Sequence, residues 1–167
     1  REELVLAAKA DTPVADIENL QAQHKQQLAF EPMDCSRLLG HDTRGGKGGT
    51  IGGAIASNLS GPRRLKAGAA RDHILGINVV SGRGEAFKSG GRVVKNVTGY
   101  DLSKLMTGSW GTFGILTDVT VKVLPSAETE TTLAIRGLSD EHATAAMALA
   151  MGSSAEVSGA AHLPYGV

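Results

Sequence analysis

The sequence has little of what marks several protein classes. A single cysteine, Cys35, excludes an intrachain disulfide and fits a reducing compartment. No apolar run approaches the roughly 18 residues of a membrane span, and no signal peptide is visible. Lysine plus arginine and aspartate plus glutamate balance at 17 each, so no net field draws the chain to nucleic acid or anionic lipid. We therefore expect a cytoplasmic protein with no direct membrane span and no nucleic-acid partner.

An initiator methionine is also missing, and Glu3–Ala8 has the pattern of a strand that begins directly at the start of the sequence. We therefore expect a segment of a longer protein. The 167 residues could form one domain, or one domain plus a piece of another. Hydrophobic residues make up 41%, enough for a core, although aromatic residues make up only 4%.

Glycine, in contrast, is abundant. The 22 glycines are nearly twice the usual share of about 7%. They cluster in Gly40–Gly61, Gly82–Gly91 and Gly99–Gly114. Such clusters are typical of loops that bend sharply or approach a ligand closely. A loop-rich enzyme fragment with many tight turns is the alternative interpretation.

The first third of the chain predicts a strand followed by a helix. Leu4–Ala8 reads as the strand, and Thr12 followed by Pro13 predicts a helix with a hydroxyl N-cap and proline in its first position. Glu31-Pro32 ends this segment. The apolar residues that recur near the helical period, and are expected to be buried, are Val14, Ile17, Leu20 and Leu28.

The middle of the chain predicts two helices and three strands. Ile51–Leu59 and Asp101–Met106 suit short helices, and Ile74–Ser81 with Glu85–Lys88 predicts a hairpin. Ile115–Leu124 alternates as a strand does, and Pro125 ends it. The expected inner face of the hairpin is Leu75, Ile77 and Val79, and one face of the last strand is Ile115, Thr117, Val119, Val121 and Val123.

Beyond Pro125 the sequence predicts a new β-α-β unit. Thr131–Arg136 and Val157–His162 read as strands, and Ser139 can cap a helix over Asp140–Met151. Residues 126–167 would then open a second α+β domain. The fold class predicted for the whole chain is α+β.

Two common nucleotide motifs are excluded. A Walker A loop needs Gly-Lys-Ser/Thr, which the sequence does not contain. A Rossmann fingerprint needs a third glycine after Gly46–Gly48, where Ile51 stands instead.

The glycines near residue 50 still have the chemistry of a diphosphate cradle. Successive glycines let backbone N–H groups converge on anionic oxygens, and a helix starting at Ile51 would add its positive end. Thr50 offers a hydroxyl, and Ser57, Asn58 and Ser60 offer polar groups further on. A glycine-lined turn that permits close packing is the alternative, and spacing leaves both open.

Four blocks carry a resemblance to a known family. They are Gly49–Gly61 with Pro62-Arg63-Arg64, then Ala70–Gly76, Lys95–Leu102 and Gly108–Thr117. Over about residues 1–125 the chain resembles the FAD-binding domain of the vanillyl-alcohol oxidase, or PCMH-type, flavoproteins. Ser60–Arg64 and Lys95–Asp101 narrow the resemblance to flavin subunits of the glycolate oxidase type.

The resemblance implies a two-lobed FAD domain with the cofactor between the lobes. Residues 1–125 resemble its second lobe, a mixed or antiparallel sheet with flanking helices. The first lobe, with its pyrophosphate loop, is expected before Arg1, and the substrate-side cap domain after Pro125. With one lobe missing, we expect weak or no FAD binding by this segment alone.

The resemblance also implies a cofactor site. Thr50, Ile51, Gly52 and Gly53 would lie along the pyrophosphate and flavin, with Gly45 nearby; Ser57, Asn58, Leu59 and Ser60 would continue beneath the cofactor; Gly114 would leave room for Ile115 to meet the adenine. Some relatives tether the flavin through His or Cys. Because Ser60 stands in this region, and no His or Cys lies between Asp42 and Asp72, we expect non-covalent FAD and no metal.

Three arginines have two interpretations each. Arg63, Arg64 and Arg71 could neutralise a diphosphate or bind a carboxylate substrate in bidentate fashion. Alternatively, Arg71 pairs with Asp72 and the other two form a solvated rim. The histidines lack metal-ligand spacing and are interpreted as structural or exposed.

The implied reaction is oxidation of a small 2-hydroxy acid to a 2-oxo acid by hydride transfer to the flavin. The implied partners are a paralogous flavin subunit and an iron–sulfur subunit, which could hold the chain peripherally at an inner membrane. No catalytic base is identified in the sequence. The alternative is a non-catalytic FAD-binding assembly or electron-relay subunit of such a complex.

Overall fold

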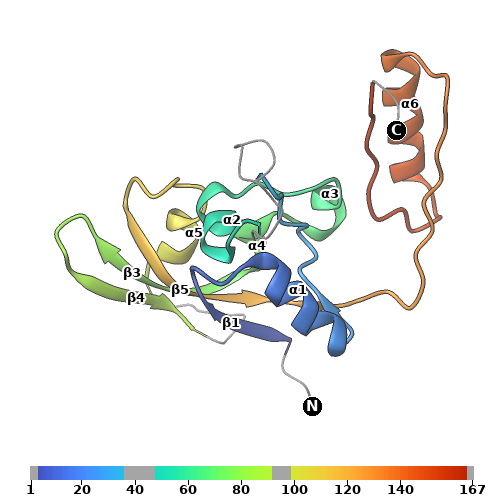
Figure 1. The fold of residues 1–167 in the computed structure, drawn as a ribbon. Helices are drawn as coiled ribbons and strands as arrows, with labels where there is room; N and C mark the ends of the chain where they lie inside the picture. The colour runs from blue at the N-terminus through green and yellow to red at the C-terminus, as the bar shows by residue number, and fades with distance from the viewer. Residues whose placement is uncertain (1–3, 36–47, 92–98, 165–167) are drawn as a thin grey trace.

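The chain folds around an antiparallel sheet, as the computed structural model of residues 4–35, 48–91 and 99–164 shows (Figure 1). The sheet has the strand order β1-β5-β3-β4, with every neighbouring pair antiparallel. Its strands are β1 Val5–Lys9, β3 Ile74–Ser81, β4 Ala86–Gly90 and β5 Gly114–Lys122. Two short strands, β2 Gln26–Gln27 and β6 Leu124–Pro125, form a separate pair that the sequence did not predict. The α+β fold class is confirmed.

In the described residues, six helices accompany the sheet. They are α1 Val14–Gln23, α2 Ile51–Ser57, α3 Arg64–Ala67, α4 Ala70–His73, α5 Leu102–Met106 and α6 Asp140–Gly152. The predicted helices near Ile51 and Asp101 are confirmed, since Thr50 caps α2 and Asp101 caps α5 with side-chain oxygens.

The predicted β3–β4 hairpin is confirmed, and its turn is closed by one serine. The Ser81 hydroxyl oxygen accepts hydrogen bonds from the backbone N–H groups of Arg83 and Glu85, at 3.2 and 3.3 Å. Gly84 has a φ of +79°, which glycine adopts without a steric penalty. Local turn chemistry therefore fixes this hairpin.

One predicted face of β5 is wrong at its beginning, because the strand is bulged. Val119, Val121 and Val123 are buried as predicted, but Ile115 is 71% exposed and Thr117 is exposed too. Asn78 pairs with Asp118 while the next residue, Val79, pairs with Leu116, so Thr117 is the extra residue. A bulge reverses the alternation beyond it. Leu116 therefore packs against the core.

A second register shift corrects the predicted face of β3. It lies between Ile74 and Gly76. As a result Ile74 is buried, whereas Leu75, predicted to face inward, is only half-buried. Ile77 and Val79 are buried as predicted.

Helix α1 starts one residue later and ends earlier than its sequence signals indicate. Pro13, not Thr12, is the N-cap, because Pro13 has an extended ψ of 137° and its carbonyl oxygen accepts from the N–H of Ile17. The helix ends at Gln23 rather than near Glu31. Leu28 is buried, but it lies in the segment beyond the helix.

The buried face of α1 is also different from the predicted one. Ile17 is buried, but the next buried position is Gln21, and Leu20 is 47% exposed. Gln21 follows Ile17 by four residues and therefore lies on the same face of the helix, so a polar side chain is buried where an apolar one was expected.

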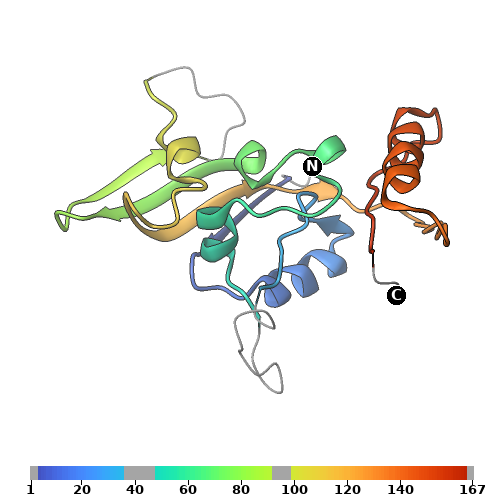
Figure 2. The ribbon, with the colours of Figure 1, turned by 90° about the horizontal axis from the view of Figure 1, so that it is seen from above.

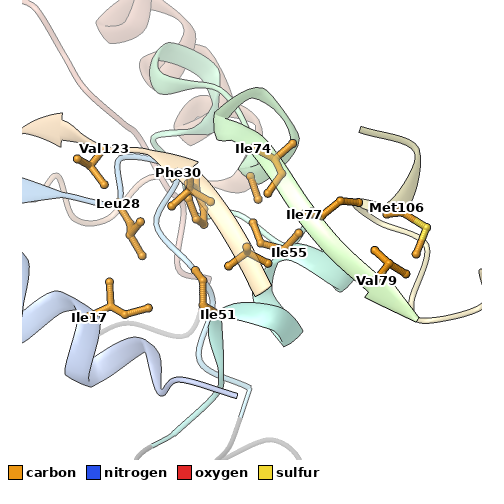
Figure 3. Packing of buried hydrophobic residues seen from close by; sticks show 13 residues of the cluster. Ile17, Leu28, Phe30, Ile51, Ile55, Ile74, Ile77, Val79, Met106 and Val123 are labelled. Atoms are coloured by element: carbon orange, nitrogen blue, oxygen red, sulfur yellow. The ribbon is translucent and has the colours of Figure 1, made fainter. Parts of the chain in front are cut away.

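The core lies between the sheet and the helices (Figure 3). Ile17 comes from α1, and Ile51 and Ile55 come from α2, toward Ile77 and Val79 of β3. Most of its members are aliphatic, and the one aromatic ring among the fully buried side chains described is that of Phe30. Seen from above, the strands are visibly twisted and α1 and α2 lie near each other (Figure 2). This core fixes the start of α2, and with it the candidate site.

The segment after β6 forms the predicted helix but not the predicted strands. Ser139 caps α6 by accepting the N–H of His142. Residues 131–136 and 157–162 belong to no strand in the described part of the chain, and Leu133 is 84% exposed. A strand needs a neighbour for its backbone groups, and these segments have none among the described residues. Helix α6 stands apart from the sheet (Figure 1).

Candidate functional site

A cavity of about 360 Å³ opens where three separate segments meet. These are the connection after β1, the start of α2, and the loop that leads into β5. Five of the residues predicted from the sequence line it: Thr50, Gly52, Gly53, Gly114 and Ile115. The lining residues that were not predicted are Ala10, Asp11, Ala56, Ser109, Trp110, Gly111 and Leu116. The structure thus brings together residues more than sixty positions apart.

The two glycines of α2 have different structural roles. A Cβ on Gly52 would lie 2.7 Å from both the Cβ and the carbonyl oxygen of Ala10, so glycine is needed for α2 to approach the chain after β1. A Cβ on Gly53 would meet only the Thr50 hydroxyl oxygen, at 3.4 Å. Gly53 is exposed and lines the cavity. It therefore leaves open space that a ligand can fill.

The first N–H groups of α2 are bonded within the chain. The N–H of Ile51 donates to the Thr12 carbonyl at 2.9 Å, and that of Gly52 donates to the Ala10 carbonyl at 2.8 Å. The N–H of Gly53 donates to the Thr50 hydroxyl oxygen at 3.2 Å. The amides predicted to cradle an anion instead hold the cavity wall in place. The Thr50 hydroxyl keeps its own hydrogen for donation.

Gly114 and Ile115 form the opposite wall. A Cβ on Gly114 would lie 2.7 Å from the Val80 carbonyl oxygen, so close strand packing requires glycine there. The bulge at Thr117 turns Ile115 away from the core, and its side chain lines the cavity instead. The β-bulge in β5 therefore gives the site an apolar residue.

The predicted residues at the far end of α2 do not line this cavity. Asn58 adopts a left-handed conformation, with a φ of 54°, and its Oδ1 accepts the N–H of Arg71 at 3.0 Å. The Ser60 hydroxyl accepts the N–H of Ala70 at 3.2 Å. Ser57 donates its hydroxyl to the Ala54 carbonyl at 3.3 Å, and Leu59 directs its N–H to Ser57. Asn58 and Ser60 thus hold the start of α4, and Gly45 lies outside the described residues.

The sequence analysis used the loop before β5 for the family resemblance but assigned no site role to residues 108–113, and the structure shows that this loop is anchored to α2. The N–H of Gly108 donates to the Ile55 carbonyl at 3.1 Å, and that of Trp110 donates to the Ala56 carbonyl at 2.9 Å. These carbonyls belong to the last turn of α2, where helix carbonyls lack intrahelical partners. The glycines at 108, 111 and 114 around the single tryptophan were the signal that could have marked this loop.

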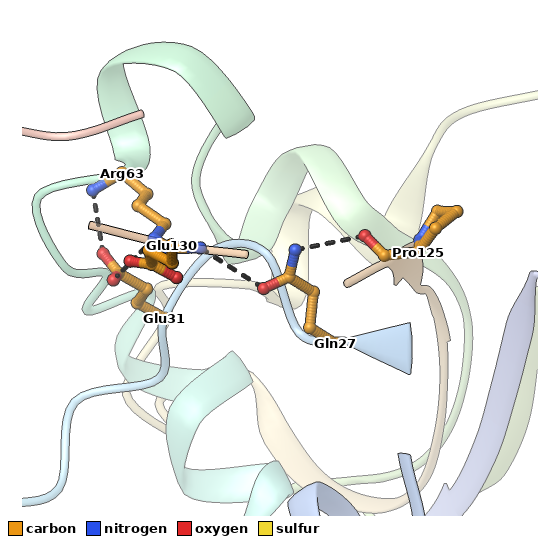
Figure 4. A network of polar contacts seen from close by, with 5 residues as sticks. All are labelled: Gln27, Glu31, Arg63, Pro125 and Glu130. Carbon is orange, nitrogen blue, oxygen red and sulfur yellow. Dashed lines mark hydrogen bonds and ion pairs between the residues drawn. The ribbon is translucent and has the colours of Figure 1, made fainter. Parts of the chain in front are cut away.

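The Arg63 side chain binds other side chains of the protein, and these contacts occupy its guanidinium group (Figure 4). Its Nε lies 3.1 Å from Glu31 Oε1, its Nη1 donates to Gln27 Oε1 at 3.3 Å, and its Nη2 pairs with Glu130. Its backbone N–H also donates to Glu31, at 2.8 Å. The guanidinium is thus neutralised by two carboxylates.

The other two arginines remain at the surface. The side chains of Arg64 and Arg71 are exposed. Although Arg71 and Asp72 both lie in the described part, no ion pair joins them, and Asp72 accepts the N–H of Ala69 at 2.8 Å instead. The predicted Arg71–Asp72 pair is therefore wrong.

Three histidines in the described ranges, His73, His142 and His162, have partners for their side chains. His73 is buried, lies 5.5 Å from the Phe30 ring, and its Nε2 is 2.7 Å from the Ala67 carbonyl. His162 lies 2.8 Å from Asp140, and His142 lies 2.9 Å from Ser139. In residues 4–35, 48–91 and 99–164, no cluster of three His, Cys, Asp or Glu side chains could hold a metal ion. No helix in these ranges is long and apolar enough to cross a membrane.

Comparison with known proteins identifies relatives over most of the chain. A family model described as an FAD binding domain matches residues 33–90. Glycolate oxidase subunit GlcE of Escherichia coli (strain K12) is 42% identical over 123 residues, covering 74% of this chain and 32% of that protein. Glycolate oxidase subunit GlcD of Bacillus subtilis (strain 168) is 37% identical over 128 residues, covering 77% and 25%. The chain thus spans about a third or less of these relatives.

A solved structure supports the same fold. Alkyldihydroxyacetonephosphate synthase matches 76% of this chain and 22% of its own chain, with a TM-score of 0.56 and 20% sequence identity. At this identity the likeness concerns the fold alone. It agrees with part of an FAD-binding domain built from a mixed set of helices and an antiparallel sheet.

Proposed function

Because this chain belongs to the family of PCMH-type FAD-binding flavoproteins, we propose that it is part of an FAD-dependent oxidoreductase acting on a small 2-hydroxy acid. FAD is the cofactor of this family, and the substrate would be oxidised at its CH–OH group to the 2-oxo acid. Two of its relatives are named glycolate oxidase subunits. Residues 1–125 would be the second lobe of the FAD domain.

The observation that carries this proposal is the meeting of Thr50, Gly53 and Ile115 in one cavity. Its volume of about 360 Å³ falls within the range of small-molecule sites and would take part of a dinucleotide. Gly53 presents no side chain to it, and Thr50 offers a hydroxyl donor. The residues therefore fit a flat, polar-edged cofactor held against α2.

The protein's share of the chemistry is to position the cofactor and to exclude water. Flavin, when bound, would supply the oxidising group for the CH–OH carbon of the substrate. Ala10, Ala56 and Ile115 give the cavity apolar walls, which keep water from the cofactor's surface. Among the described lining residues, Asp11 is the one charged side chain, and the base for the substrate hydroxyl proton would come from another part of the protein.

We propose that the cofactor is held without a covalent bond. Neither histidine nor cysteine occurs among the described residues that line the cavity. Ser60, which stands where some relatives carry a tethering residue, accepts a backbone hydrogen bond from Ala70 and cannot form such a link.

The remaining parts of the proposal concern assembly. Residues 126–167 would begin a substrate-side domain, and α6 standing apart from the sheet is compatible with this. Two relatives are named as different glycolate oxidase subunits, which supports a paralogous flavin subunit as partner. An iron–sulfur subunit would take the electrons, in the cytoplasm or at the inner membrane surface.

A second candidate is a flavin-holding subunit that relays electrons or stabilises the assembly without oxidising substrate itself. The cavity lining favours keeping this candidate, because in the described part Asp11 is its one titratable side chain and no His, Lys or Tyr lines it. A paralogous subunit would then carry out the oxidation.

Substitution of Gly53 by leucine in the full-length protein tests the cofactor site. The new side chain meets little protein but fills the cavity, so the purified variant should lose flavin absorbance near ~450 nm. Gly82→Leu is the matched control, because Gly82 lies in the hairpin turn with open space around it. Stoichiometric FAD in Gly53→Leu would overturn the site. Complex activity that survives the loss of flavin would favour the relay candidate.

A further inference from the structure

Trp110 has a backbone conformation that large side chains rarely adopt. Its φ is +55° and that of Gly111 is +76°, and the N–H of Thr112 donates to the Ser109 carbonyl at 3.0 Å. Positive φ at both central residues of a four-residue turn is the signature of a type I′ turn. Such turns favour Asn-Gly, whereas a bulky aromatic residue at the first position is an outlier.

Hydrogen bonds hold this turn in place despite its strain. The N–H of Trp110 donates to the Ala56 carbonyl of α2 at 2.9 Å. The Thr112 hydroxyl donates to the Ser109 carbonyl at 2.7 Å. Strained residues persist only where their surroundings over-determine them, and they concentrate at functional sites. The turn is thus fixed to the same helix whose first turn forms another wall of the cavity.

Packing does not account for the indole. Trp110 is the single tryptophan of the chain, yet it is 68% exposed. Buried aromatic side chains stabilise a fold through the area they remove from water, and most of this area stays in water. Trp110 is among the residues that line the cavity, together with Gly53 and Ile115. The other lining residues are glycines, alanines, small polar residues, Asp11, Ile115 and Leu116, so Trp110 is the one aromatic residue in the lining described.

We propose that Trp110 is the aromatic contact surface of this site, and that it packs against a planar ring of the bound flavin dinucleotide. The inference rests on the proposed function and adds a positioning residue to it. An aromatic face suits either planar ring of the cofactor, the isoalloxazine or the adenine. Ligand contact would bury the indole that the fold leaves exposed, and would explain why a tryptophan occupies a position suited to asparagine.

The test is Trp110→Asn in the full-length protein. Asparagine tolerates positive φ, so the variant should unfold at the same or a higher temperature than wild type. Loss of the ring should raise the dissociation constant for FAD about tenfold, which corresponds to about 1.4 kcal/mol. Trp110→Phe, which keeps an aromatic face, should stay within about threefold of wild type. Phe113→Asn is the control, because Phe113 is 56% exposed but does not line the cavity.

Two further measurements identify the ring. If the isoalloxazine contacts the indole, flavin fluorescence should be quenched in wild type and recover in bound Trp110→Asn. If the adenine does so, ADP should compete about tenfold less well in the variant, with flavin fluorescence unchanged.

The outcomes separate this inference from the proposed function. Unchanged FAD affinity in Trp110→Asn would overturn the inference alone. A marked loss of thermal stability in that variant would also overturn it, because the indole would then be a packing residue. A wild-type protein that binds no FAD would overturn the proposed function and the inference together.

Discussion

Among the described side chains, Gln21 has the most buried polar atoms without a hydrogen-bond partner. It is 2% exposed, and both Oε1 and Nε2 lack a partner within the described residues. Burial of a polar group without a partner costs about 1–3 kcal/mol. It lies on the inner face of α1 one turn after Ile17.

Gln21→Met should therefore stabilise the fold. Methionine has a similar length and no group that needs a hydrogen bond, so the free energy of unfolding should rise by about 1 kcal/mol or more. Thermal unfolding should show this as an increase of about 2–4 °C per kcal/mol. Leu20→Gln is the matched control, since Leu20 is 47% exposed and should change stability little. A Gln21→Met variant that is less stable than wild type would show that the amide has partners in solution.

At the same scale, the sequence could predict that α1 exists but not which residues it buries. Leu20 and Gln21 differ by one position, and apolar character favoured Leu20. Which of them faces inward depends on how α1 is held. The N–H of Val14 donates to the Gly49 carbonyl, a contact between distant segments. Periodicity alone contains no information about that contact.

At the scale of elements, most predictions based on local chemistry were right, the Thr12 cap of α1 being an exception, and those based on strand partners were wrong. The β3–β4 hairpin follows from its own turn residues, and α2 and α5 follow from the capping side chains of Thr50 and Asp101. The bulge at Thr117 depends on the register between two strands, which the sequence of β5 does not reveal. Local signals therefore predicted the elements, and tertiary pairing decided which side of β5 faces the cavity.

The candidate site was predictable to the same extent. Thr50, Gly53 and Ile115 were assigned by resemblance, and they do meet in one cavity. Trp110 was missed because its importance depends on a turn type that its residue identity disfavours. The sequence could not show whether the first N–H groups of α2 are free to bind an anion. The carbonyl groups of Ala10 and Thr12 accept two of them, and no residue near α2 in the sequence indicates this contact.

The outer face of β1 and β5 carries a pH-dependent contact. Lys9 Nζ lies 2.6 Å from Asp118 Oδ1, and Asn78 and Thr117 donate to Asp118 Oδ2 at 3.2 and 3.0 Å. Hydrogen bonds from Lys9, Asn78 and Thr117 lower the pKa of Asp118 below its usual value. A lowered pKa in the folded state adds stability above the unfolded pKa of about 3.9, and this is lost as the pH falls through the folded value.

Asp118→Asn should therefore be slightly less stable than wild type at neutral pH, and the difference should shrink as the pH falls below about 4. Urea unfolding at a series of pH values measures it. Because these groups are at the surface, high salt should reduce the gap. Lys9→Met should reproduce part of the effect by removing the partner charge. A difference that is constant from neutral pH to pH 2 would mean that the Asp118 charge does not stabilise the sheet.

At the scale of the whole molecule, the segment after β6 is joined to the sheet and helices through Arg63. Its guanidinium pairs with Glu130, on that segment, and with Glu31, near the core residue Phe30. The Gln27 amide donates to the Pro125 carbonyl at 3.2 Å, next to the same junction. The predicted strands at residues 131–136 and 157–162 needed pairing partners that the described chain does not offer. Among the described residues, these polar contacts link the segment after β6 to the rest of the fold.

Arg63→Met should loosen this junction without disturbing the sheet. The Arg63 side chain is 19% exposed while Glu31 and Glu130 are 36% and 57% exposed, so the loss should be on the order of 1 kcal/mol. Hydrogen exchange should become faster in residues 126–139 and stay unchanged in β3 and β5. Arg64→Met is the control, because the neighbouring Arg64 is exposed and has no ion pair in the described part of the chain. Equal exchange in the two variants would mean that α6 is held by other contacts, since Arg63 differs from Arg64 chiefly in its carboxylate partners.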